Sequence, residues 1–486
     1  MISSMITSSL RLAALAGLIA GFAGSQQTAP RAKTANGIVQ GVVDSASGVL
    51  VFRGIPYAAP PVGDLRWRAP RPAANWSGVR DASKLGHNCM QHQPYDDIDP
   101  FTAGVSEDCL YLNVWTSSLS PARKRPVMVW IHGGGFWAGF GGEERHNGAP
   151  LAKKGAVVVT LNYRLGPFGF LAHPALADNS RDPVGNYGLL DQIAALKWVK
   201  RNIARFGGDP NRVTIFGESA GGMSVGSLIA SPLAKGLFQR AILESGTGVN
   251  GLGVFTRDTA QAIASQFVDS LHLTGSGADL ARQLRAADAK DLLNASLHIG
   301  PPYSPRFFPV VDGVVLPHAV DTALMNGTAN LVPVIVGTNR DEGDEWMGAP
   351  SRAFARLVTS HNVPAYLYIF SRVGADSVNQ KRGAYHSAEI TFVFGRPTPL
   401  QPSAGKTTYD ATVADAMSDY WVAFASAANP NAPPARGKWP TWPKYDPKTD
   451  ALLEIGADIG ARTNFKRAVY DSLDAAARSR GRLRPE

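Results

Sequence analysis

The sequence predicts an α/β fold with a mostly parallel central sheet flanked by helices. Apolar residues recur at helical spacing in 186–210, and that stretch ends in Gly-Gly-Asp-Pro, a helix stop. A strand-like run follows at 211–216, where Val213 and Ile215 alternate with Thr214. Small and apolar residues at 220–230 then predict a second helix. The order helix, strand, helix is the repeating unit of a parallel sheet.

Composition supports one large domain, predicted at 26–486. The chain has 486 residues, of which 44% are hydrophobic and 18% charged, and no short internal repeat is visible. The net charge is +9, yet no basic stripe with interleaved aromatic residues occurs, so no nucleic-acid partner is expected. A solvated basic tail is predicted at about 478–486 from four arginines, Arg478, Arg480, Arg482 and Arg484.

The first 25 residues are predicted to be a secretory signal peptide, with Met5 as an alternative start. Arg11 precedes an apolar run at 12–24, which is too short to span a bilayer. Ala23 and Ser25 suit the −3 and −1 positions of a cleavage site. We therefore expect a secreted or periplasmic protein without a stable membrane anchor.

The chain has only two cysteines, Cys89 and Cys109. An exported chain meets oxidising conditions, so we expect them to pair, with two free thiols as the alternative. The loop that the disulfide closes would be worth ~3 kcal/mol in the chain-entropy model.

Three glycines follow an early strand. The apolar run 127–131 leads into His132 and then Gly133, Gly134 and Gly135. Glycines at this place can turn backbone N–H groups toward one point, as stabilisation of a developing oxyanion requires. A flexible surface loop is the alternative interpretation. A dinucleotide site fits poorly, because the spacing G-x-G-x-x-G does not occur here.

The stretch FGESAGG, at 216–222, contains the pattern G-x-S-x-G. By itself this pattern also suits a plain turn. Its flanks predict a strand before and a helix after Ser219, which is the setting of a nucleophile elbow. Gly217 and Gly221 would let the helix approach the sheet closely, and the turn would hold the Ser219 hydroxyl at the helix N-terminus.

An acid and a histidine should follow the serine in that order. The strand-like run 331–336 is followed by Asp341-Glu342-Gly343, and periodicity alone does not choose between the two acids. The next strand-like run is 365–370, and the catalytic histidine should lie beyond it. Five histidines follow the serine, namely His272, His298, His318, His361 and His386, and only the last lies beyond that strand.

Several longer motifs resemble those of the type-B carboxylesterases, the family that includes the cholinesterases and some fungal lipases. The resemblance runs from about Gly37 to about Asp446. It rests on VFRGIPYAAPPVGDLRWRAPRP, SEDCLYLNVW, FGGDPNRVTIFGESAGG, VGTNRDEG, HSAEITFVFGRP and YWVAFASAANPN.

The resemblance implies an α/β-hydrolase fold and a set of site residues. It makes Ser219 the nucleophile, His386 the base and Glu342, as the second residue of D-E-G, the acid of a triad. It gives the oxyanion hole to Gly134, Gly135 and Ala220, and matches Cys89–Cys109 to the first disulfide loop of the family. Glu218, Ser245 and Glu389 resemble polar residues behind the histidine, where a tuning role and plain buried hydrogen bonding are both open.

The expected function is hydrolysis of a small-molecule carboxylic ester through an acyl-enzyme, with no metal or cofactor. A lipase acting on longer-chain acylglycerols and a non-catalytic cholinesterase-like binding protein are the alternatives. The sequence carries no indication of oligomeric state. Tyr95 and Phe101 are the only aromatic residues between the two cysteines, so the tryptophan that holds choline in some family members is missing.

One segment departs from the family pattern. Only 44 positions separate Glu342 from His386, about half of what the resemblance leads us to expect, and the shortening is placed after DEGDEWMGAP. The absent chain would wall one side of the pocket. Two consequences are open, a pocket that accepts bulkier esters and a truncation that damages folding or activity.

Overall fold

A computed structural model describes residues 29–93, 99–101, 103–177, 183–251, 253–299, 307–374, 377–396 and 411–479. The predicted signal peptide lies outside these ranges. The chain is built around one eleven-stranded sheet. Its strands, in spatial order, are β16 (Ile459–Arg462), β15 (Leu452–Ile455), β14 (Ala365–Phe370), β13 (Val334–Asn339), β12 (Arg240–Glu244), β11 (Gly208–Glu218), β9 (Arg125–Ile131), β10 (Val157–Leu161), β8 (Tyr111–Thr116), β4 (Leu50–Pro56) and β3 (Val42–Val43).

The middle of the sheet is parallel and its edges are antiparallel. Each neighbouring pair from β10 through β9, β11, β12, β13 and β14 to β15 is parallel. The pairs at the two edges run antiparallel. Because parallel strands end at the same edge of a sheet, the loops after β9, β11, β12 and β13 open toward one region. The predicted fold class is confirmed.

Side chains on the two faces of the sheet belong to two separate hydrophobic cores. In β14, residues 365, 367 and 369 join one core and residues 366, 368 and 370 join the other. The first core contains apolar side chains of α3 (Tyr187–Asn202) and α4 (Ala220–Ala230), and the second contains those of α11 (Ile390–Val393) and α12 (Ala411–Ala427). Strands buried on both faces are expected to be apolar, as β9 is after Arg125 and as β14 is along its whole length.

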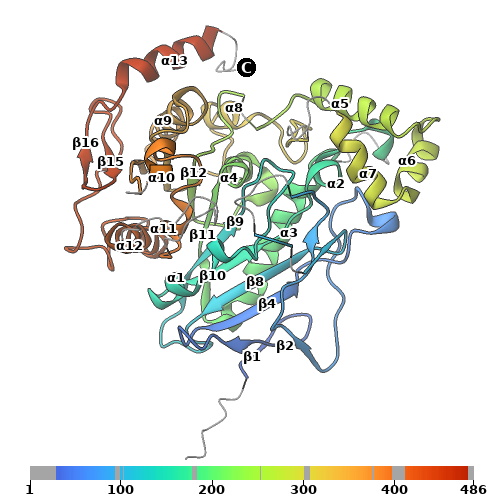
Figure 1. Cartoon of the computed structure of the whole chain (residues 1–486), viewed down its shortest axis with the longest axis horizontal. Helices are drawn as coiled ribbons and strands as arrows, with labels where there is room; N and C mark the ends of the chain where they lie inside the picture. Colours follow the sequence, from blue (N-terminus) through green and yellow to red (C-terminus); the bar gives the residue numbers. More distant parts are fainter. Residues whose placement is uncertain are drawn as a thin grey trace, which may run out of the picture.

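The remaining helices are α1 (Ala149–Lys153), α2 (Gly166–Phe170), α5 (Arg257–Ser270), α6 (Gly277–Ala286), α7 (Ala289–Ala295), α8 (Val320–Met325), α9 (Ala349–Thr359), α10 (Ser377–Arg382) and α13 (Arg467–Ser479). Small sheets form from β1 (Arg31–Lys33), β2 (Ile38–Gln40) and β5 (Val79–Asp81), and from β6 (Asn88–Cys89) and β7 (Val105–Ser106). Figure 1 shows α5, α6 and α7 gathered on one side of the molecule, opposite β15, β16 and α13. No helix in the described ranges is long and apolar enough to cross a bilayer.

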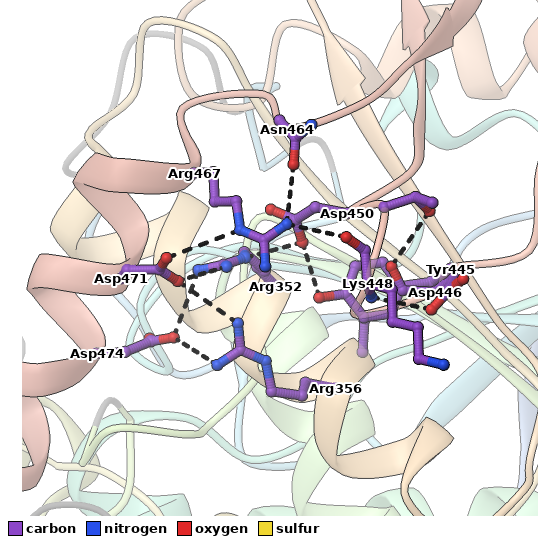
Figure 2. Close-up of polar contacts among 12 residues, drawn as sticks. Arg352, Arg356, Tyr445, Asp446, Lys448, Asp450, Asn464, Arg467, Asp471 and Asp474 are labelled. Carbon is purple, nitrogen blue, oxygen red and sulfur yellow. Dashed lines mark hydrogen bonds and ion pairs between the residues drawn. The ribbon is translucent and has the colours of Figure 1, made fainter.

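Ion pairs dock α13 against α9 (Figure 2). Arg352 of α9 is 1% exposed, and its guanidinium lies 2.6 Å from the carboxylate of Asp471 and 2.9 Å from that of Asp450. Arg356, one turn later, pairs with Asp474 at 3.4 Å. A shift of α13 would separate the buried Arg352 guanidinium from carboxylates that compensate its charge. These contacts therefore specify one docking position for α13.

Two predicted boundaries need correction. The predicted strand at 331–336 is β13, which starts at Val334 and continues to Asn339. Pro333 has no N–H group for the ladder, so pairing starts after it. The predicted basic tail also begins later than expected, because Arg478 lies in the last turn of α13, while residues 480–486 lie outside the described ranges. The predicted runs 365–370 and 220–230 coincide with β14 and α4.

Candidate active site

Ser219 stands alone between β11, which ends at Glu218, and α4, which begins at Ala220. Its backbone has φ 58° and ψ −122°, a combination that non-glycine residues rarely adopt. The Ser219 N–H donates to the carbonyl of Glu244 on the neighbouring strand β12 at 2.9 Å, which holds the strained turn in place. The predicted strand, tight turn and helix around this serine are confirmed.

Glycines around Ser219 allow α4 to pack directly on the end of β9. A Cβ added to Gly221 would lie 2.0 Å from the carbonyl oxygen of Ile131, and one added to Gly217 would lie 2.6 Å from the same atom. No side chain fits at such distances. The glycines of G-x-S-x-G therefore serve the close approach of helix and strand that the sequence predicted.

The loop after β9 lies beside Ser219. A Cβ added to Gly133 would be 3.2 Å from the Cβ of Ser219, and the next two residues, Gly134 and Gly135, have φ of 92° and 62°. Within the part of the chain that the structure describes, no acceptor bonds the backbone N–H groups of Gly134, Gly135 or Ala220. Free donors beside a strained serine are what an oxyanion hole requires.

Glu342, rather than Asp341, meets His386. The Glu342 Oε2 atom lies 2.6 Å from His386 Nδ1. Its Oε1 atom accepts hydrogen bonds from the Ser245 hydroxyl and from the Asn339 N–H, each at 2.6 Å, and from the Thr338 hydroxyl. Both carboxylate oxygens are thus engaged, and one of them faces the imidazole.

The second imidazole nitrogen faces another carboxylate. His386 Nε2 lies 3.1 Å from Glu218 Oε1, and among the described residues no hydrogen bond joins His386 to the Ser219 hydroxyl. Burial disfavours the charged ring, but the negative charge of Glu218, the hydrogen bond to Glu342 and the charge of Glu389 outweigh it and raise the pKa of His386. This arrangement favours the imidazolium when no substrate is bound.

Two further glutamates are buried behind the histidine. Glu389 Oε2 accepts from the Asn339 side-chain amide at 2.5 Å, and burial together with the neighbouring charges of Glu218 and Glu342 raises its pKa to about 8. Glu244 Oε1 accepts from the Trp421 indole N–H at 2.8 Å, and burial raises the pKa of Glu244 well above its usual range. Burial thus works against the charged form of both carboxyls.

Sequence reasoning did not name Glu244, Thr338 or Asn339. Glu244 is the last residue of β12 and lies in register with Glu218, the last residue of β11. Thr338 and Asn339 end β13. A polar residue at the carboxyl end of a buried parallel strand is the signal that could have identified all three.

The two cysteines form a disulfide, as predicted, with their Cα atoms 4.9 Å apart. Both are buried. Tyr95 and the acidic residues directly after it lie outside the described residues. Phe101 contacts Phe140 in an edge-to-face geometry, with ring centroids 5.9 Å apart.

The carboxylesterase family model matches this chain over residues 28–348 and 343–472. The two matched stretches overlap at 343–348, which includes η7 (Asp344–Gly348). This overlap lies within DEGDEWMGAP (341–350), the motif after which the shortening is predicted.

Relatives cover nearly the whole chain. The para-nitrobenzyl esterase of Bacillus subtilis is 35% identical, over 88% of this chain and 94% of its own length. The fumonisin B1 esterase of Sphingopyxis macrogoltabida is also 35% identical, over 88% of this chain and 86% of its own. The crystal structure of a Geobacillus stearothermophilus carboxylesterase superposes with a TM-score of 0.78 at 31% identity, over 91% of this chain and 99% of the other. The chain belongs to the carboxylesterase family and is a serine hydrolase of carboxylic esters.

Proposed function

We propose that Ser219, His386 and Glu342 form the catalytic triad and that the enzyme acts on small to bulky carboxylic esters through an acyl-enzyme. The observation that carries this proposal is the 2.6 Å contact between Glu342 and His386. Three donors hold the acid, and the strained Ser219 stands beside Glu218, which the same histidine touches.

In the first half-reaction the Ser219 oxygen attacks the ester carbonyl while His386 Nε2 takes the hydroxyl proton. The N–H groups of Gly134, Gly135 and Ala220 stabilise the negative oxygen that develops. The alcohol leaves with the proton from His386. Water, deprotonated by the same nitrogen, then releases the acid and restores the serine.

Proton transfer from Ser219 requires a neutral imidazole that has left Glu218. Ser219 follows Glu218 directly in the chain, and Nε2 exchanges the Glu218 carboxylate for the Ser219 hydroxyl when substrate binds in this mechanism. Catalytic hydrogen bonds commonly tighten only when substrate is bound. The neutral form needs Glu342 at Nδ1, because this contact leaves the lone pair of Nε2 free for the serine proton.

We propose further that the pocket is open on the side of the shortened segment. Trp346 lies on η7, four residues after Glu342, and is 53% exposed. Exposure of a large aromatic side chain fits the loss of a covering segment at this point. The pairing of β13 with β14 is continuous from Val334↔Ala365 to Asn339↔Phe370, so the shortening leaves the sheet under the triad intact. This supports an open pocket over a damaged fold.

A hydrolysis panel tests both proposals. p-Nitrophenyl esters from acetyl to a bulky aromatic acyl group, with para-nitrobenzyl acetate added because one relative is named for such esters, would be compared by kcat/KM. An open pocket wall buries little apolar surface of the acyl group, and each Å² that is buried contributes only ~25 cal/mol. We therefore expect kcat/KM to vary less than about tenfold across the panel, with a high KM for small esters. A steep preference for acetyl would contradict the open pocket. Inactivity of the folded protein on the whole panel would favour the truncation.

We also propose that the chain is exported and cleaved near Ala23–Ser25. The apolar run at 12–24 and the pairing of Cys89 with Cys109 support an oxidising destination. Intact-mass spectrometry of exported protein should show a chain that starts just after Ser25. A mature chain that starts at Met1 or Met5 would contradict the proposal.

A further inference from the structure

The loop that carries His386 is bonded at successive residues to the loop that carries Glu342. The Asn339 side-chain amide donates to the carbonyl of Tyr385 at 2.7 Å. Asp341 Oδ2 accepts from the N–H of Ala384 at 2.7 Å, and the Asp341 N–H donates to the Ala384 carbonyl at 3.1 Å. Together with the contact between Glu342 and His386, residues 384, 385 and 386 each have a partner in 339–342.

The Asp341 carboxylate is itself fixed in place. The Arg340 guanidinium lies 2.9 Å from Asp341 Oδ2, and this hydrogen bond lowers the pKa of Asp341. The carboxylate therefore stays an acceptor throughout the neutral range. Arg340 in turn donates its own backbone N–H to the carbonyl of Phe370 at 2.8 Å, so the pair is anchored to the end of β14.

Gly383 shows how closely the two loops approach. A Cβ added to Gly383 would lie 2.4 Å from Asp341 Oδ2, and the residue has φ 68°. Ser387, on the other side of His386, also has a positive φ, of 70°. A loop with two such residues keeps its shape only if its surroundings hold it. The buried Ala384 would lose the acceptor of its N–H if Asp341 were truncated.

We propose that Asp341 is a positioning residue whose carboxylate fixes the loop of His386 against Glu342. The role rests on the proposed function, in which these two residues are base and acid. Asp341 acts through Ala384 and has no part in the bond-making steps. A displacement of the base by about 1 Å can cost about 100-fold in rate, so an anchor two residues before His386 has a measurable effect.

The first test compares Asp341→Ala with Asp341→Asn, using p-nitrophenyl acetate. We expect Asp341→Ala to lower kcat about 10- to 100-fold with little change in KM, because the base is misplaced while the pocket is not. The Asp341→Asn variant should retain most of the wild-type activity, since its amide oxygen can still accept a hydrogen bond from the Ala384 N–H. A kcat of Asp341→Ala within about twofold of wild type would overturn the proposal.

The pH profile distinguishes positioning from a general loss of structure. Three carboxylates face His386, from Glu218 on β11, from Glu342 after β13 and from Glu389 before α11, and each raises its pKa. A looser contact with Glu342 lowers that pKa, so the neutral base appears at lower pH. The acidic limb of kcat/KM should therefore move to lower pH in Asp341→Ala and stay in place in Asp341→Asn. An unmoved limb in the alanine variant would contradict the proposal.

A double-mutant cycle with Gly383→Ala tests the contact from the other side. A methyl group at 383 collides with the Asp341 carboxylate, so the single variant should lose activity. Much of that loss should vanish when Asp341 is already alanine, because the colliding atom is gone. Strictly multiplicative losses would show that the two sites are uncoupled and would overturn the proposal.

The Ser219→Ala and Asp341→Ala proteins together distinguish the positioning role of Asp341 from the proposed function. An inactive Ser219→Ala protein together with an Asp341→Ala protein of wild-type kcat would overturn the positioning role alone. An active Ser219→Ala protein would overturn the proposed function. If Asp341→Ala does not fold, Gly383→Ala takes its place, and an unchanged kcat of that folded variant would overturn the positioning role. Active-site titration with a phosphonate ester normalises the kcat of the Asp341 and Gly383 variants to folded protein, because these variants keep Ser219.

Discussion

Ser219→Ala should abolish turnover of every ester that the wild-type protein hydrolyses, with a loss of about 10⁴- to 10⁶-fold in kcat. The variant lacks the only oxygen that can form the acyl-enzyme in the proposed mechanism. Its oxyanion donors and pocket remain, so the residual rate reflects binding and electrostatic stabilisation alone. Folding should be little affected, because the hydroxyl makes no hydrogen bond within the described part of the chain.

A serine within α4, the helix that follows Ser219, offers a matched control. Ser227 is buried on α4, and its hydroxyl has no hydrogen-bond partner among the described residues. Ser227→Ala should therefore retain wild-type kcat. Mass spectrometry after treatment with an ester phosphonate should show one adduct on the wild-type and Ser227→Ala proteins and none on Ser219→Ala. Ester hydrolysis by Ser219→Ala at a rate near that of wild type would contradict the assignment of the nucleophile.

The sequence predicts those parts of the fold and site that depend on local patterns. β14 and α4 coincide with the predicted runs because each is a short apolar stretch bounded by turn residues. The order of Ser219, the acid and His386 follows from the strands that each one comes after. The chemistry of G-x-S-x-G is visible for the same reason, since strand, strained turn and helix are consecutive in the chain.

Contacts between distant segments could not be predicted in this way. Periodicity did not separate Asp341 from Glu342, because the backbone of the loop, held by Ala384, decides which carboxylate turns toward His386. Arg352 is buried because its guanidinium meets Asp471, 119 positions later in the chain. Nothing near Arg352 in the sequence indicates that partner. The role of α13 was missed for the same reason, and its last arginine was interpreted as part of a tail.

Glu342→Gln should lower kcat by about 10³- to 10⁴-fold while the protein remains folded. The reason lies in the hydrogen bonds of the acid. Oε1 accepts from the Ser245 hydroxyl, the Thr338 hydroxyl and the Asn339 N–H, so the carbonyl oxygen of the new amide must face these donors. The amide NH₂ then points at His386 Nδ1. It donates to that nitrogen and stabilises the tautomer with its proton on Nε2, which cannot accept the proton of Ser219.

The pH dependence supplies an independent readout of the same substitution. Glu342 is one of the carboxylates that raise the pKa of His386, through its hydrogen bond and its charge. Removing that charge lowers the pKa, and because the base acts when neutral, the residual activity should appear at lower pH than in the wild-type protein. Asp341→Asn removes the same charge one residue earlier and should keep most of the activity, since its amide oxygen can still accept from Ala384. A Glu342→Gln protein with near wild-type kcat, or an Asp341→Asn protein with the larger loss, would reassign the acid of the triad.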